Sequence, residues 1–88
     1  MESLISYIIE KADELNLRYE IHRFPSGAAM IDIWLKHAFC VIQLYQDEIG
    51  MSLIEDEKAI PFDTRPDRSF NRERVFKEEL EKVLSTYQ

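Results

Sequence analysis

The sequence predicts an α+β domain in which a four-stranded antiparallel meander sheet is flanked by an N-terminal and a C-terminal helix, in the order α-β-β-β-β-α. Three observations support this prediction. Apolar residues recur at helical spacing near both ends of the chain, they alternate with polar residues in between, and the strands are joined by very short links. Helices segregated from an antiparallel sheet are typical of the α+β class, and we expect both helices mainly on one face.

The first expected element is a helix over residues 3–15. Its apolar side chains recur at spacings of one, three and four, the pattern of a helix with one buried stripe. They are Leu4, Ile5, Ile8, Ile9, Ala12 and Leu15. Ser3 is expected to cap the first turn by accepting a backbone hydrogen bond, and Asn16 tolerates the left-handed conformation in which many helices end.

The apolar period changes to two at residue 17, which predicts a half-buried strand that ends near Phe24. Pro25, Ser26 and Gly27 then form a turn, because proline presets the first corner and glycine accepts a positive φ. The chain is therefore expected to reverse directly into a second strand.

Three further strands are expected at about 29–36, 39–46 and 49–54. Links of two or three residues cannot form the crossover that parallel strands need, so neighbouring strands must be antiparallel and in sequence order. Strict alternation then assigns a set of side chains to the face under the helices. They are Leu17, Tyr19, Ile21, Ile31, Ile33, Leu35, Cys40, Ile42, Leu44, Ile49, Met51 and Leu53.

Residues 55–70 are polar and contain two prolines, so they are expected to form a surface connection with a brief extended stretch at Ile60 and Phe62. A second helix should follow, with Asn71 as its N-cap and with Phe70 and Val75 at the positions of a hydrophobic staple. Its expected buried stripe consists of Phe76, Leu80, Val83, Leu84 and Tyr87.

The 88 residues are expected to form a single domain, 1–88, since a second core could not be built from what would remain. Seventeen acidic against eleven basic residues give a net charge of −6, which disfavours nucleic acid and acidic membranes and favours basic partners. Five of the acids lie within residues 47–58, against one lysine. One cysteine, no secretory pattern at the start and no membrane-length apolar run together predict a cytoplasmic protein.

The face of the sheet opposite the expected core is unusually apolar, and it is the predicted partner-binding surface. An exposed antiparallel face is normally polar, whereas Trp and Tyr are frequent in binding hot spots. The predicted contact residues are Met30, Trp34, Phe39, Val41, Gln43 and Tyr45. Three occupants stay open: the chain's own helix or its 55–70 loop, a second copy in a homodimer, and a foreign protein.

A second candidate site consists of four arginines near the start of the last helix, where backbone N–H groups favour anions. They are Arg65, Arg68, Arg72 and Arg74, and they are interleaved with Asp63, Asp67 and Glu73. The alternative is that these acids neutralise the arginines in local salt bridges.

The sequence favours no enzyme, cofactor or metal. His22, His37 and Cys40 are its only soft metal ligands, and they show no recognisable zinc spacing. Cys40 falls on the core face and is expected to be a buried hydrophobe. With only two glycines there is no phosphate loop, dinucleotide motif or nucleophile elbow, so no catalytic residue is predicted.

The leading hypothesis is a small non-enzymatic protein-binding module that acts through a sheet face and acidic loops. In size and charge alone, the chain resembles bacterial immunity and antitoxin proteins, which implies neutralisation of a basic partner. The first alternative is nucleic-acid or anion binding through the four arginines. The second is a ligand-binding or enzymatic site at a homodimer interface.

Overall fold

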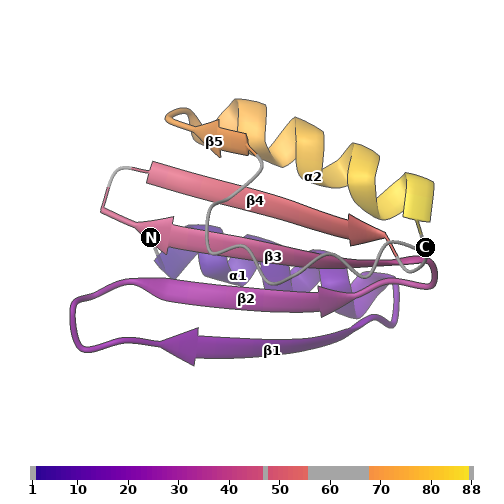
Figure 1. The fold of residues 1–88 in the computed structure, drawn as a ribbon, viewed down its shortest axis with the longest axis horizontal. Helices are drawn as coiled ribbons and strands as arrows, with labels where there is room; N and C mark the ends of the chain where they lie inside the picture. The colour runs from indigo at the N-terminus through magenta and orange to yellow at the C-terminus, as the bar shows by residue number, and fades with distance from the viewer. Residues whose placement is uncertain (1, 47, 56–67, 88) are drawn as a thin grey trace.

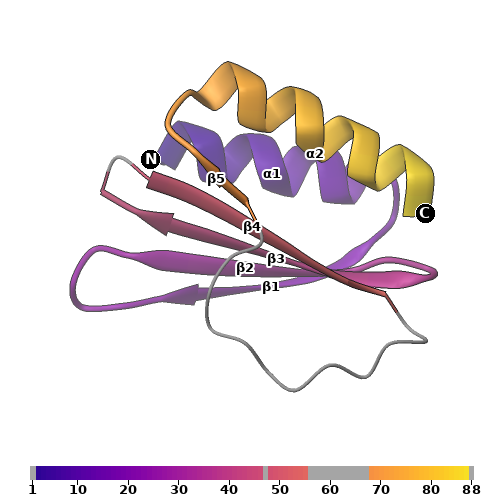
Figure 2. The same cartoon turned by 45° about the horizontal axis from the view of Figure 1, so that its top comes forward.

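The computed structural model describes residues 2–46, 48–55 and 68–87. These contain two helices, α1 (Glu2–Glu14) and α2 (Glu73–Tyr87), and five strands. The strands are β1 (Arg18–Arg23), β2 (Ala29–Trp34), β3 (Ala38–Tyr45), β4 (Glu48–Glu55) and β5 (Arg68–Phe70). They form one antiparallel sheet in the order β1-β2-β3-β4-β5, and both helices lie on the same face of it (Figures 1 and 2). The predicted α+β meander is confirmed, with one short strand added.

Helix α1 packs its apolar stripe on the sheet and ends as the sequence predicts. Asn16 has a φ of 55°, in the left-handed region. The amide of Leu17 donates to the carbonyl of Ala12 at 2.8 Å, and the amide of Asn16 donates to Asp13 at 3.1 Å. These two bonds form a Schellman motif, which satisfies carbonyls that the helix would otherwise leave unpaired. The expected Ser3 cap is wrong, because the helix already includes Glu2 and Ser3 lies inside its first turn.

The turn between β1 and β2 has the predicted chemistry. The amide of Gly27 donates to the carbonyl of Phe24 at 3.0 Å, and the amide of Phe24 donates to Ala28 at 3.0 Å. Gly27 has a φ of +93°, so the glycine is needed for its backbone freedom. A three-residue loop of this kind keeps the two strands paired from Arg23 and Ala29 onward.

The core lies between the sheet and the two helices. Each of the twelve sheet residues assigned to this face belongs to the hydrophobic cluster, either buried or packed against it. Helix α1 contributes Leu4, Ile5 and Ile8, and helix α2 contributes Phe76, Leu80, Val83 and Leu84. Tyr87 packs against the same cluster, whereas Leu15 is 36% exposed and falls outside the buried stripe.

Strand β5 changes how helix α2 begins. Phe70 and Ser69 pair with Ile49 and Gly50 of β4, which holds the chain extended as far as Phe70, and a bend at Asn71 precedes the helix. The carbonyl of Arg72 accepts the first helical bond, from Phe76 at 3.2 Å, so Arg72 and not Asn71 is the N-cap.

The expected staple between Phe70 and Val75 is also wrong. Phe70 meets Phe76 instead, edge to face, with ring centroids 5.8 Å apart, and Val75 is 38% exposed. A helix that starts one residue later moves its fourth position from Val75 to Phe76, so the contact moves with it.

Two polar contacts join the helices to each other. Glu81 accepts a hydrogen bond from the hydroxyl of Tyr7 at 3.2 Å, and it pairs with Lys11 at 3.2 Å. At the far end of α2, the amide of His37 in the β2–β3 link donates to the carbonyl of Tyr87 at 3.4 Å. Neither helix described here has the length and apolar character needed to cross a membrane. The extended stretch expected at Ile60 and Phe62 lies outside the described residues.

Candidate functional site

The candidate site is the face of the sheet that points away from both helices, called here the outer face (Figure 2). Strand pairing places the predicted partner-binding residues together on it. Met30 pairs with Gln43, and Trp34 pairs with Phe39. Val41 and Tyr45 extend the same side of β3, because side chains two apart on a strand share a face. The six residues therefore occupy adjacent positions on two central strands.

One row of paired residues across the outer face contains two aromatic side chains and has an arginine at its β1 end. Arg18, Trp34, Phe39 and Ile54 are successive register partners on β1, β2, β3 and β4. The guanidinium of Arg18 lies 4.5 Å from the centre of the Trp34 ring, and the Trp34 and Phe39 ring centroids are 5.1 Å apart. These contacts hold the indole in one orientation, since aromatic pairs and cation–π contacts each contribute about 0.5–1 kcal/mol or more.

The outer face is unevenly accessible. Tyr45 is 48% exposed, whereas Val41 is 8% exposed and buried. Met30, Trp34, Phe39 and Gln43 are half-buried. Val41 therefore supports its neighbours and is not itself accessible to a partner. The helix-covering alternative is wrong, because both helices lie on the other face (Figure 2). Residues 56–67 of the loop alternative lie outside the described residues, so that alternative stays open.

Beside the apolar residues, toward the β1 edge, the outer face carries a cluster of three polar side chains, called here the His22 cluster: Glu20, His22 and Asp32. Glu20 and Asp32 are register partners on β1 and β2, and His22 lies two residues beyond Glu20. The His22 Nε2 atom is 3.1 Å from Asp32 Oδ2 and 3.8 Å from Glu20 Oε2. The Asp32 side chain is only 13% exposed, against 42% for His22 and 50% for Glu20.

The His22 cluster was not predicted from the sequence, where the two histidines stand with Cys40 as the soft metal ligands. The structure separates those three residues. Cys40 is fully buried on the core face, where burial raises the pKa of its thiol to about 12. His37 is exposed in the β2–β3 link. The available signal was alternation, which puts Glu20, His22 and Asp32 on one face, but their contact depends on how β1 and β2 pair.

The structure does not gather the four predicted anion-binding arginines into one site. Arg68, on β5, pairs with Glu79 of α2 at 2.6 Å. Arg72 and Arg74 are exposed at the start of α2, and Arg65 lies outside the described residues. A hollow of about 380 Å³ beside this helix start has Glu48 and Glu73 as its charged lining residues. The described part of the arginine segment is thus engaged by acids or open to solvent.

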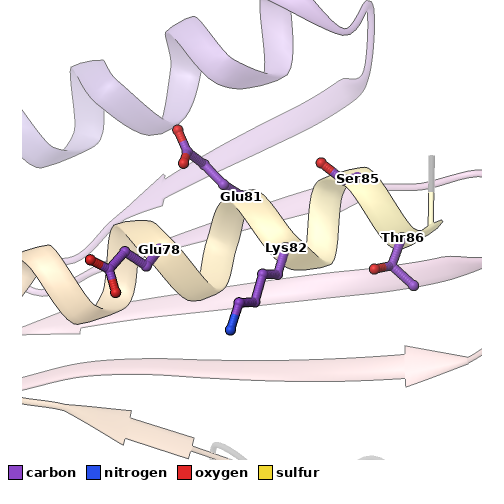
Figure 3. A pocket seen from close by; sticks show the side chains of 5 residues that line it. All are labelled: Glu78, Glu81, Lys82, Ser85 and Thr86. Carbon is purple, nitrogen blue, oxygen red and sulfur yellow. The ribbon is translucent and has the colours of Figure 1, made fainter.

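A second hollow, of about 610 Å³, lies on helix α2 (Figure 3). Its lining residues, Glu78, Glu81, Lys82, Ser85 and Thr86, all belong to that one helix. Glu81 points toward α1, where the hydrogen bonds from Lys11 and then from Tyr7 lower its pKa. Lys82 pairs with Glu79 at 3.6 Å. These side chains connect or solvate the helices and converge on no common point.

The outer face therefore combines accessible aromatic surface with carboxylates and an imidazole. Glu20, Asp32 and Glu48 supply its negative charge, and Arg18 its positive charge. Of the acidic stretch 47–58, Glu48 is exposed, while Asp47 and residues 56–58 lie outside the described residues. Compared with known proteins, the chain matches no family model, and neither a curated protein nor a solved structure shows significant similarity to it.

Proposed function

We propose that this chain is a binding module that docks another protein on the outer face of its sheet. The observation that carries the proposal is the aromatic row of Trp34 and Phe39, with Tyr45 nearby, on the face opposite both helices. Trp and Tyr dominate binding hot spots because they bury a large area with few rotatable bonds. The contacts of Trp34 with Phe39 and Arg18 fix its ring before a partner arrives, which lowers the entropy lost on binding.

The charge on the outer face favours a partner with basic side chains around an apolar centre. Glu20, Asp32 and Glu48 flank the aromatic residues, and the whole chain carries a net charge of −6. Complementary charge speeds association and rejects acidic competitors more than it adds affinity. Neutralisation of a basic partner, as immunity and antitoxin proteins perform it, is the finer form of this proposal.

The test uses Tyr45→Ala, because Tyr45 is the most exposed of the predicted contact residues and its loss should leave the core intact. The bait is the full chain, incubated with native lysate, and the captured partner is then purified and titrated. If Tyr45 is a hot spot, its truncation weakens binding by about 30-fold, which corresponds to about 2 kcal/mol. Leu15→Ser is the matched control, because Leu15 is an exposed apolar residue on the helical side.

Charge reversal tests the expected partner chemistry separately. Glu48→Lys should slow association and weaken binding, most strongly at low salt, while Glu78→Lys on helix α2 should have little effect. Binding that survives Tyr45→Ala, or that is lost equally in Leu15→Ser, contradicts a docking surface on the outer face. Sedimentation of the chain alone identifies the homodimer alternative, since a second copy would then occupy the face.

A further inference from the structure

We infer that Glu20, His22 and Asp32 form a divalent metal site with an open coordination position, and that Zn²⁺ is the ion it fits. The three side chains offer one imidazole nitrogen and two carboxylate oxygens, all within 4.8 Å of one another. They project from paired positions on two strands, which hold ligands more firmly than a loop does. This inference does not depend on whether the outer face binds a protein.

The donor spacing is close to that of a tetrahedral zinc site. Bonds of about 2.0–2.2 Å at tetrahedral angles place neighbouring donor atoms about 3.3–3.6 Å apart. The His22 Nε2 atom is 3.1 Å from Asp32 Oδ2 and 3.8 Å from Glu20 Oε2. One distance is slightly short and the other slightly long, and the Glu20 and Asp32 oxygens lie within 4.8 Å of each other, so side-chain rotations are needed to bring all three donors to a common ion.

The charges around the cluster suit a dication. Two carboxylates balance the charge of Zn²⁺, and Asp32 is only 13% exposed, so its charge is poorly hydrated where it stands. Among the described residues, Arg18 contacts the other oxygen of Glu20, Oε1, at 3.5 Å. The Oε2 atom that faces His22 can therefore bind a metal while the Arg18 contact remains.

The donor set distinguishes among metals. Imidazole nitrogen and carboxylate oxygen are both zinc ligands, and zinc sites with three protein ligands leave the fourth position to water or a substrate group. Ca²⁺ takes six to eight oxygen ligands, which these side chains do not provide, and Mg²⁺ prefers oxygen ligands to an imidazole nitrogen. Cu²⁺ binds most nitrogen and oxygen sites more tightly than Zn²⁺, so copper binding would not be diagnostic.

The experiment titrates the full chain, freed of metal with a chelator, with Zn²⁺ in a calorimeter and with Co²⁺ in a spectrophotometer. Trp34 is the only tryptophan and lies two residues from Asp32 on the same face, so its fluorescence reports binding locally. We expect one ion per chain and Co²⁺ absorption of tetrahedral intensity. Millimolar Mg²⁺ should not displace the Zn²⁺.

Two ligand variants and one matched control decide the assignment. His22→Gln and Asp32→Asn should each weaken Zn²⁺ binding by at least about tenfold, since even indirect partners of a metal contribute that much. His37→Gln removes the other histidine and should bind as the original chain does. If a ligand variant fails to fold, Zn²⁺ is added instead to the original chain and its imidazole NMR signals are recorded. Zn²⁺ should then shift the signals of His22 and leave those of His37 unchanged.

Several results would overturn the inference. They are the absence of Zn²⁺ binding at millimolar concentration, binding unchanged in both ligand variants, and binding lost in His37→Gln. Displacement of Zn²⁺ by an equal concentration of Mg²⁺ or Ca²⁺ would refute the choice of metal. In the first three cases the contact between His22 and Asp32 is a hydrogen bond with a structural role only.

Discussion

The rate at which a thiol reagent labels Cys40 tests the sheet and its core together. The expected slowing of that rate can be worked out from the structure. Cys40 is fully buried on β3, in register with Ile33 on one side and Leu53 on the other. Burial raises the pKa of its thiol from 9.0 to about 12. At pH 8 that change lowers the thiolate fraction from roughly one tenth to about one in ten thousand, so the reactive form is about a thousandfold scarcer.

A thiol reagent reaches Cys40 only when the sheet opens, and because the exposed thiol then regains its ordinary pKa, the opening equilibrium sets the labelling rate. Opening of a core strand requires a free energy close to that of global unfolding, about 4–13 kcal/mol for a chain of this length. Even the lower value slows labelling by roughly a thousandfold relative to the unfolded chain. Ile8→Val, a one-methylene deletion at a fully buried site, should lower stability by about 0.5–1.5 kcal/mol and speed labelling by roughly 2- to 13-fold.

The assay is absorbance of a chromogenic disulfide reagent at pH 8, with the urea-unfolded chain as the reference rate. Native labelling within about tenfold of the unfolded rate would refute the placement of Cys40 in the core. A rate unchanged in Ile8→Val would show that β3 opens locally, without helix α1. Either result would contradict the packing of the helix layer on the sheet.

Three further predictions concern stability. Phe76→Ala should lower the free energy of unfolding in urea by about 3–5 kcal/mol, because Phe76 is fully buried, while Phe70→Ala at its half-buried partner should lower it less. Gly27→Ala should lower the free energy of unfolding by about 1–2 kcal/mol in the same assay, because a φ of +93° is strained for alanine. The added methyl group itself would enter open space. An unchanged free energy of unfolding would contradict this backbone conformation. The hydrogen bond from Lys11 lowers the pKa of Glu81. The ionised Glu81 carboxylate therefore stabilises the fold at pH values above 4.5, the ordinary pKa of glutamate, and this stabilisation is lost as the pH falls below 4.5. Melting temperatures should therefore fall less between pH 7 and pH 3 in Glu81→Gln than in the original chain, and equal falls would contradict a role for this contact.

Helix ends show where local sequence was sufficient and where it was not. Asn16 was predicted correctly because the Schellman motif involves only residues within one turn of it. Asn71 was assigned wrongly because strand pairing, and not local capping preference, decides where helix α2 begins. Phe70 is held against Ile49 of β4, and the chain bends at Asn71 before the helix starts at Glu73.

The fifth strand was missed for a similar reason. Arg68, Ser69 and Phe70 are too few to show an alternating pattern, and they follow a polar stretch with two prolines. Their strand conformation depends on hydrogen bonds to β4, which are contacts distant in sequence. Short edge strands of this kind are defined by their neighbour more than by their own composition.

The amino-acid sequence by itself determined the order of the main elements, the direction of the strands and the side chains on each face of the sheet. These follow from apolar periodicity and link length, which act over a few residues. Only the tertiary structure decided that Val41 is buried while Tyr45 is exposed, and that His22 meets Asp32. Alternation gives each residue a face, but which residues of two strands become neighbours depends on pairing and packing across the whole fold.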